Sequence, residues 1–265
     1  MKKFDGFLIG GNWIRPASRE TLELRNPAND EVYGAVVMGA AEDADAAVRA
    51  AHAAFPSFAA TSKEDRLQLL KRILDVYERR YDELAAAMTE EMGAPVRLSH
   101  EAQAAAGADY IRATIEAFES FEIERSGAGR VLLRREPVGV CALITPWNWP
   151  LNQIAGKVAP ALAAGCTMVL KPSELTPMSA TLFAEVLVEA GVPAGVFNLV
   201  HGDGSAVGTA LSSHPLVDMV SFTGSTAAGV KVAINAAPSV KRVTQELGGK
   251  SANILLHDAD FDIAV

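Results

Sequence analysis

The chain has 265 residues, 49% of them hydrophobic, so it is long enough for one large domain with a substantial core. Its 24 basic and 32 acidic residues give a formal net charge of -8 without a basic cluster, which argues against nucleic acid as a partner. The N-terminus lacks the apolar core of a secretory signal, and no apolar run approaches about 18 residues, so we expect no membrane span.

The cysteines and histidines point to no disulfide and no metal site. Cys141 and Cys166 are the only two cysteines, and both lie in apolar stretches that predict strands. We expect buried free thiols in a reducing cytoplasm. The five histidines show no metal-ligand spacing.

The first 125 residues predict a scaffold without chemistry. Residues 7–25 suggest a hairpin-like start around Gly10 and Gly11, and residues 32–37 predict a strand. Ser62 with Asp65 resembles a capping box, and Gly93 marks the end of a helix. Helices are expected over residues 42–58, from Ser62 onward, over 81–92 and over 97–121.

A turn and an exposed strand follow. Residues 126–129 predict the turn, and residues 130–136 predict a strand in which Val131, Leu132 and Leu133 lie among charged residues. An exposed strand edge of this kind invites pairing with another strand.

Residues 138–177 form the segment around which the rest is organised. Residues 138–144 predict a strand buried on both faces, residues 152–164 a helix ending at Gly165, and residues 167–170 a second buried strand. Together they predict a β-α-β unit. Ligands of open α/β sheets bind at the carboxyl ends of the strands.

Polar side chains follow both strands of this unit. Lys171, Ser173 and Glu174 follow the second strand, and Glu174 has the position of the acid that binds the adenosine ribose in dinucleotide folds. Asn148 follows the first strand in a turn restricted by prolines, where its amide could donate to a developing oxyanion. The alternative for Asn148 is an ordinary surface turn.

The α/β alternation continues with a helix over residues 177–190 and strands over 196–200, 219–222 and 241–245. Residues 202–208 begin as G-x-G, but Val207 takes the place of the third glycine, so we predict no phosphate loop of that type. Residues 223–229 open a helix whose N–H groups offer a pyrophosphate seat, or simply a capped helix. Glu246 could be a general base toward water, or a solvated acid in a turn. A strand over 253–256 and a helix over 258–265 are expected next.

Four of these motifs occur together in the order and spacing of the aldehyde dehydrogenase superfamily. The chain resembles this superfamily over essentially its whole length. The motifs are Pro146-Trp147-Asn148-Trp149-Pro150, Lys171-Pro172-Ser173-Glu174, Phe222-Thr223-Gly224-Ser225-Thr226 and Glu246-Leu247-Gly248-Gly249-Lys250.

The resemblance implies an α/β fold with a Rossmann-like open parallel sheet and helices on both faces. It implies an NAD(P)-binding domain at residues 1–118 and 138–248, β strands of an oligomerisation arm at 119–137, and the start of a catalytic domain at 249–265. The family's nucleophilic cysteine lies beyond Val265, and neither Cys141 nor Cys166 matches it. We therefore expect a chain that is truncated before that cysteine and inactive alone.

The resemblance also assigns roles to residues. Asn148 corresponds to the oxyanion-hole amide, Glu246 to the general base and Lys157 to a lysine behind the site. In the family, the residues matching Lys171 and Glu174 hold the adenosine ribose. The implied cofactor-binding residues are Ile144, Thr145, Pro146, Trp147, Lys171, Ser173, Glu174, Gly204, Gly208, Phe222, Thr223, Gly224, Ser225, Thr226, Gly229 and Leu247.

The implied reaction of the intact enzyme is oxidation of a small-molecule aldehyde to a carboxylic acid through a cysteine thiohemiacetal and thioester. Glu174 favours NAD because a carboxylate repels a 2′-phosphate, while Lys171 leaves NADP open. The full-length protein is expected to be a cytoplasmic homodimer or homotetramer. Two alternatives stay open: a non-catalytic nucleotide-binding module, and a different α/β dehydrogenase, against which the Asn148 and Glu246 motifs weigh.

Overall fold

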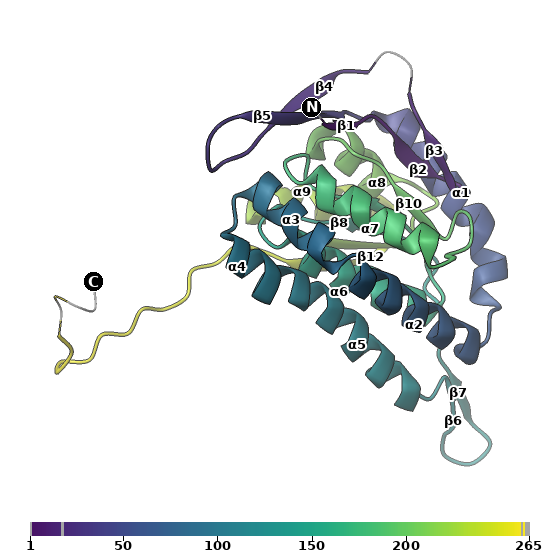
Figure 1. Cartoon of the computed structure of the whole chain (residues 1–265). Coiled ribbons are helices and arrows are strands. Elements are labelled where there is room, and N and C mark those ends of the chain that lie inside the picture. The colour runs from purple at the N-terminus through teal and green to yellow at the C-terminus, as the bar shows by residue number, and fades with distance from the viewer. Residues whose placement is uncertain (1, 17–18, 261, 263–265) are drawn as a thin grey trace.

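The described chain folds around a seven-stranded sheet with helices on both faces (Figure 1). The computed structural model describes residues 2–16, 19–260 and 262. The five strands from β12 to β10 are parallel, and the hairpin of β2 and β3 adds two antiparallel strands at one edge. The strand order is β12 (Arg242–Glu246), β11 (Met219–Thr223), β8 (Val140–Ile144), β9 (Thr167–Lys171), β10 (Phe197–Leu199), β2 (Phe7–Ile9), β3 (Asn12–Ile14). The predicted α/β class is confirmed.

Strands β8 and β9 are buried along their whole length because helices cover both sides of the sheet. Successive side chains of a strand point to opposite faces, so Cys141 and Leu143 pack into one core cluster, and Val140 and Ala142 into the other. The first cluster includes helices α2 (Lys63–Arg79), α6 (Pro150–Ala164) and α7 (Pro177–Glu189). The second includes α1 (Ala41–Ala59), α8 (Thr209–Ser213) and α9 (Thr226–Ala236).

An outer layer of helices packs on the first cluster. Helix α3 (Tyr81–Met92) contacts α7, and α5 (Ala105–Ser120) contacts α2 and α6. The helix predicted over residues 97–121 is present but irregular, since α4 (Val96–Leu98) and a π-helical segment η1 (Ser99–Ala104) precede α5. No described helix has both the length and the apolar composition that crossing a membrane requires.

Local signals in the sequence fix several helix ends as predicted. The Ser62 side chain accepts from the Asp65 N–H, and the Asp65 carboxylate accepts from the Ser62 N–H, which completes the capping box of α2. Such a cap contributes about 1 kcal/mol to helix stability. Gly165 ends α6 at a φ of 82°, a left-handed conformation that favours glycine.

Two smaller sheets lie outside the central one (Figure 1). Strands β1 (Lys2–Phe4), β5 (Val32–Val37) and β4 (Thr21–Arg25) form a three-stranded sheet. The hairpin of β6 (Glu124–Ser126) and β7 (Leu132–Arg134) protrudes from the body. The strand predicted over 130–136 is therefore shorter than expected, and one of its edges is already paired with β6.

The last described segment departs from the sequence prediction. Residues 251–256 form no regular structure and are exposed, so the strand expected over 253–256 is wrong. A strand needs a hydrogen-bonding neighbour, and the segment leaves the body as an extended tail (Figure 1). Of the helix expected over 258–265, residues 258 and 259 form a turn and a bend, while 261 and 263–265 lie outside the described residues.

Candidate functional site

The carboxyl ends of four parallel strands meet at one edge of the sheet. The register pairs Ile144 of β8 with Lys171 of β9, and Thr223 of β11 with Glu246 of β12. Phe222 of β11 pairs with Ile144, which links the two halves. The turns that follow these strands are therefore neighbours, as the sequence analysis expected. They span residues 145–149, 172–176, 224–225 and 247–250.

Lys171 places a buried cation at this edge, because its side chain is only 4% exposed. Its Nζ donates to the carbonyl oxygens of Pro172 at 2.6 Å and Gly202 at 2.7 Å, and lies 3.6 Å from Oε2 of Glu174. Burial lowers the pKa of Lys171, and the charge of Glu174 opposes that effect. The ammonium is thus fixed as a compact point charge beside an acid.

Glu174 and Ser173 lie in the turn after Lys171, but Glu174 is open to a ligand while Ser173 makes hydrogen bonds within the turn. The Glu174 side chain is 34% exposed, so its carboxylate is open to a ligand. The Ser173 hydroxyl accepts from the Leu175 N–H at 3.3 Å, and the Ser173 carbonyl accepts from the Thr176 N–H at 3.2 Å. Ser173 therefore shapes the turn that presents Glu174.

The glycines of residues 202–208 leave room beside the Lys171 side chain. A methyl group on Gly208 would lie 3.9 Å from Cδ of Lys171, and one on Gly204 would meet no atom within 4 Å. The segment is a π-helical turn, η2 (Gly204–Gly208), capped by Asp203, which accepts from the Ala206 N–H at 2.6 Å. The interpretation that this is not a G-x-G-x-x-G phosphate loop stays a prediction.

His201 lies next to Lys171 without adding charge. It is fully buried, and burial together with the Lys171 ammonium lowers its pKa to about 3. Its Nε2 lies 3.2 Å from the Thr181 hydroxyl. This lowered pKa favours the neutral imidazole near pH 7, so Lys171 rather than His201 carries the positive charge of this pair.

Asn148 is presented at the surface by a held backbone. The Thr145 N–H donates to the Lys171 carbonyl at 3.1 Å, which extends the β8–β9 ladder into the turn. Trp147 is 51% exposed, and Asn148 is exposed as well. The Gln103 side chain donates to the Asn148 carbonyl at 3.3 Å, whereas the Asn148 amide makes no hydrogen bond within the described residues. The amide is thus available to a ligand.

The start of helix α9 is a capped turn packed against β12. The Ser225 hydroxyl accepts from the Ala228 N–H at 3.3 Å, and the Gly224 N–H donates to the Glu246 carbonyl at 3.0 Å. Gly224 covers the buried ring of Phe222, since a methyl group at Gly224 would lie 2.6 Å from that ring. The cap expected of a simple helix start is therefore present. A role for Thr223 and Thr226 in holding pyrophosphate stays a prediction.

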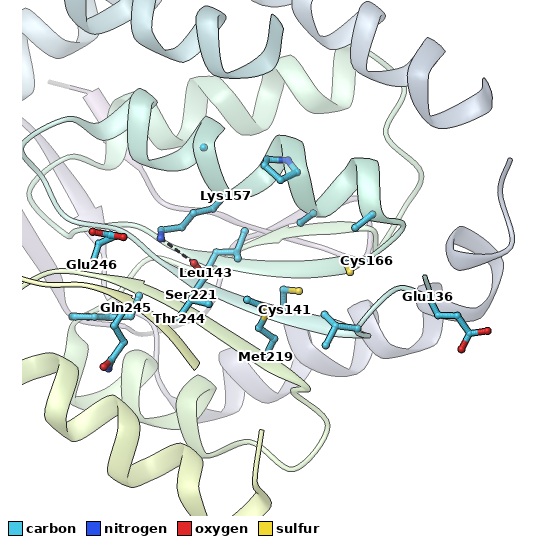
Figure 2. A pocket seen from close by; sticks show the side chains of 16 residues that line it. Glu136, Cys141, Leu143, Lys157, Cys166, Met219, Ser221, Thr244, Gln245 and Glu246 are labelled. Atoms are coloured by element: carbon cyan, nitrogen blue, oxygen red, sulfur yellow. Dashed lines mark hydrogen bonds between the residues drawn. The ribbon is translucent and has the colours of Figure 1, made fainter. Parts of the chain in front are cut away.

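Lys157 and Glu246 line one pocket between α6 and the strands β11 and β12 (Figure 2). The pocket has a volume of about 490 Å³. The Lys157 Nζ donates to the Ser221 hydroxyl at 2.9 Å. Burial lowers the pKa of Lys157, and the charge of Glu246 works against that effect. Figure 2 shows Lys157 and Glu246 toward the same end of the pocket.

The two cysteines lie away from this end. Cys141 is the second residue of β8 and Cys166 directly precedes β9, so both lie toward the amino ends of the strands. Both are buried free thiols, as the sequence predicted. Figure 2 places them toward the other end of the pocket from Glu246. Neither therefore lies beside Asn148 at the carboxyl edge.

One residue that contacts the site and one that contacts the helix after it were missed in the sequence. Gln103 is buried and holds the Asn148 backbone. Glu91 is buried at the end of α3 and accepts hydrogen bonds from the first turn of α7. A signal for Glu91 was present, because an acid in the last turn of a helix opposes that helix's own dipole. Among the described residues no cluster of histidine, cysteine and acidic side chains could hold a metal ion.

Comparison with known proteins identifies the class. Residues 13–265 match the sequence profile of the aldehyde dehydrogenase family, and the chain belongs to this family. It is 55% identical over 267 aligned positions to 3-succinoylsemialdehyde-pyridine dehydrogenase of a Pseudomonas species, covering 100% of this chain and 56% of that protein.

Solved structures agree with this assignment. An aldehyde dehydrogenase from Bartonella henselae superposes with a TM-score of 0.95 at 46% identity, covering 99% of this chain and 56% of that one. A cysteine-to-alanine mutant of aldehyde dehydrogenase C from Pseudomonas syringae, complexed with NAD+ and octanal, gives a TM-score of 0.94 at 52% identity, covering 97% and 53%. The chain thus spans about half the length of the relatives it matches.

Proposed function

We propose that this chain is the NAD-binding part of an enzyme that oxidises a small-molecule aldehyde to a carboxylic acid. Membership of the aldehyde dehydrogenase family supports the reaction class. The NAD+ complex of the Pseudomonas syringae relative supports the cofactor. The observation that carries the proposal is the buried Lys171 ammonium beside the open Glu174 carboxylate at the carboxyl edge of the sheet.

The residues at this edge fit the adenosine part of NAD. The Glu174 carboxylate can accept hydrogen bonds from the two ribose hydroxyls, and Lys171 can donate to the same sugar. Gly204 and Gly208 leave space for the adenine. The hydroxyls of Thr145 and Thr223 are buried without a hydrogen-bond partner among the described residues, which suits a polar ligand at this edge.

The pyrophosphate is assigned to the start of α9. A helix N-terminus carries partial positive charge and unpaired N–H groups, both of which favour a phosphate. The Ser225 cap and the Gly224 contact with β12 fix this helix end at the same edge of the sheet as the ribose turn, with β8 between the two strands that lead to them. The remaining predicted members of the cofactor set flank this path; they are Ile144, Pro146, Trp147, Ser173, Phe222, Thr226, Gly229 and Leu247.

NAD supplies the hydride acceptor when it is bound. Asn148 would donate its side-chain amide to the aldehyde oxygen as negative charge develops there. Glu246 would take a proton from the water that hydrolyses a thioester. Lys157 would lie behind this site, where its ammonium donates to the Ser221 hydroxyl and is stabilised in its protonated form by the charge of Glu246.

The nucleophilic thiol is proposed to come from outside these 265 residues. The buried positions of Cys141 and Cys166, toward the amino ends of the strands, support this. We assign residues 1–118 and 138–248 to NAD binding, the hairpin within 119–137 to homo-oligomer contacts, and 249–265 to the start of a catalytic domain. Exposed Val131 and Leu132 on or beside β7 support the oligomer contact, and two free thiols support a cytoplasmic location.

Hydrogen exchange of the chain with and without NAD tests the assignment. NAD should slow exchange in residues 171–176 and 223–229 and leave the β6–β7 hairpin unchanged. The hairpin is the internal control because it lies far from the proposed path (Figure 1). Protection confined to other segments, or no protection at saturating NAD, would overturn the proposed site.

A further inference from the structure

Glu91 forms an unusual contact between two helices. It is 4% exposed at the end of α3, yet its carboxylate serves the start of α7. Its Oε2 accepts from the Met178 N–H at 2.7 Å, and its Oε1 accepts from the Ser179 N–H at 3.1 Å. Pro177, the first residue of α7, has no N–H, so Glu91 takes the next two donors of that helix.

The Glu91 carboxyl group does nothing for the end of α3 and stabilises the start of α7. The last turn of a helix ends in free carbonyl oxygens, which cannot donate to a carboxyl group, whereas the first turn of another helix offers free N–H groups, which can. Glu91 is therefore placed for α7 rather than for its own helix. Helix α7 has no side-chain cap of its own, because Thr176 at the cap position makes no such hydrogen bond. Glu91, from another part of the chain, takes the place of the missing side-chain cap of α7.

The end that Glu91 holds is continuous with the turn that presents Glu174. Only Leu175, Thr176 and Pro177 separate Glu174 from Met178. The turn is closed at its other end by Lys171, whose Nζ is fixed by the carbonyls of Pro172 and Gly202. The segment is thus fastened at both ends, by Lys171 from β9 and by Glu91 from α3.

We propose that Glu91 is a positioning residue for the cofactor: it fixes the first turn of α7 and thereby sets the place of the Glu174 carboxylate. This inference rests on the proposed function, because it assumes that Glu174 contacts the ribose of NAD. Glu91 itself touches no ligand in this account. Its effect on NAD must therefore act through Glu174.

The surroundings of Glu91 contain few other charges. Glu90 precedes it on α3 and pairs with Lys2 of β1, whose Nζ also lies 3.3 Å from the Met178 sulfur. Tyr33 of β5 has a buried hydroxyl without a hydrogen-bond partner among the described residues. Glu90→Gln is a matched control, since it makes the same substitution one residue away, and the amides of Met178 and Ser179 donate to Glu91 rather than to Glu90.

The first part of the test uses the chain without NAD. In the parent, the amides of Met178 and Ser179 should exchange more slowly than the amides of exposed turns. The Gln side chain in Glu91→Gln keeps only one acceptor oxygen, so one of the two amides should exchange at least about tenfold faster, while Glu90→Gln should leave both unchanged. Fast exchange of these amides in the parent would overturn the inference without reference to any variant.

The second part measures NAD affinity by calorimetry in a double-mutant cycle with Glu174→Gln. Glu91→Gln alone should weaken NAD by about threefold or more, and should add almost nothing once Glu174→Gln is present. A purely structural loss would add in both backgrounds, and would overturn the inference. Equal NAD affinity of the parent and Glu91→Gln would overturn it as well.

The outcomes separate this inference from the proposed function. If the folded parent does not bind NAD, the proposed function fails and the inference falls with it. If the parent binds NAD and loses affinity in Glu174→Gln but not in Glu91→Gln, only the inference falls. If Glu90→Gln weakens NAD as much as Glu91→Gln, the effect is one of net charge and the inference is wrong.

Discussion

The Lys157 ammonium donates a hydrogen bond to the Ser221 hydroxyl at 2.9 Å, and this bond joins α6 to β11 in the pocket that Glu246 also lines. The ammonium is half-buried, and the charge of Glu246 stabilises its protonated form. Removing the acceptor of a partly buried charged donor lowers the free energy of unfolding. The Lys157–Ser221 bond therefore stabilises the pocket in which Glu246 lies.

Ser221→Ala removes the acceptor and leaves the Lys157 ammonium with less compensation for its burial. We expect the free energy of unfolding to fall by about 1.5–3 kcal/mol, the usual range for a hydrogen bond to a charged group. Urea denaturation measures this loss. Ser213→Ala on the exposed side of α8 is the control, and an equal change in both variants would contradict the assignment.

Glu246→Gln tests the proposed base in a protein that carries both this chain and the nucleophilic cysteine. In the proposed mechanism, hydride transfer does not need Glu246, but hydrolysis of the thioester does. We expect a burst of NADH close to one per site, followed by a steady rate lower by about 100-fold or more. An unchanged steady rate, or loss of the burst itself, would contradict this role.

Gly139 directly precedes β8 and lies against Asp218, which precedes the neighbouring strand β11, so a side chain at Gly139 does not fit. It has a φ of 123°, and a methyl group there would overlap the Asp218 carboxylate, which accepts from the Val140 N–H at 2.8 Å. We expect Gly139→Ala to destabilise the chain by about 3 kcal/mol, from backbone strain and overpacking together.

Gly191→Ala is the matched control for that variant. Gly191 also has a positive φ, of 80°, but no atom lies within 4 Å of a methyl group there. Its cost should be about 1 kcal/mol, from the backbone alone. Thermal or urea unfolding of the two variants measures both losses. An equal fall in the free energy of unfolding of Gly139→Ala and Gly191→Ala would contradict the account.

The sequence was sufficient where the structure depends on local chemistry. The Ser62–Asp65 capping box and the Gly165 stop need only neighbouring residues, and both helix ends formed as predicted. The buried runs before Thr145 and Lys171 identified two strands, and their parallel direction placed the polar turns at one edge. The residues of the cofactor and catalytic sets could be named through the family's motifs, but their roles remain predictions.

The sequence was insufficient where the contact is distant along the chain. Glu91 and Met178 are separated by 87 positions, so no local pattern links them. The π-helical turns of η1 leave the hydrophobic periodicity almost unchanged and were missed for that reason. The apolar run around Ile254 predicted a strand, but a strand depends on a pairing partner, and none contacts this exposed segment within the described residues.

Glu91 should also make stability depend on pH. Burial raises its pKa from 4.5 to about 8, against the lowering effect of the hydrogen bonds from Ser179 and Met178. The folded chain therefore binds a proton that the unfolded chain releases, and stability should fall as the pH rises from about 4.5 to about 8, by up to roughly 1.4 kcal/mol per unit.

Urea unfolding at several pH values measures this slope. Glu91→Gln should flatten it across that window, because the amide does not titrate, while Glu90→Gln should retain it. A parent whose stability rises over the same window would show that Glu91 is ionised in the folded chain, and that its hydrogen bonds outweigh its burial.

Glu174 should also set the preference between the two nicotinamide cofactors. In the proposed site, its carboxylate would accept from the 2′-hydroxyl of NAD and would repel the 2′-phosphate of NADP. We expect Glu174→Gln to weaken NAD but to affect NADP little or to strengthen it, which narrows the ratio of their dissociation constants by about tenfold. Equal weakening of both cofactors would mean that Glu174 does not contact the ribose.

The most direct measurement is a calorimetric titration of NAD into the 265-residue chain, beside Glu174→Gln and the control Glu189→Gln on the exposed side of α7. The account predicts a dissociation constant on the order of micromolar for the parent and the control, and a loss of about tenfold or more in Glu174→Gln. A folded parent that does not bind NAD, or a Glu174→Gln variant that binds it as well as the parent, would contradict the central claim that the Lys171–Glu174 turn holds the cofactor.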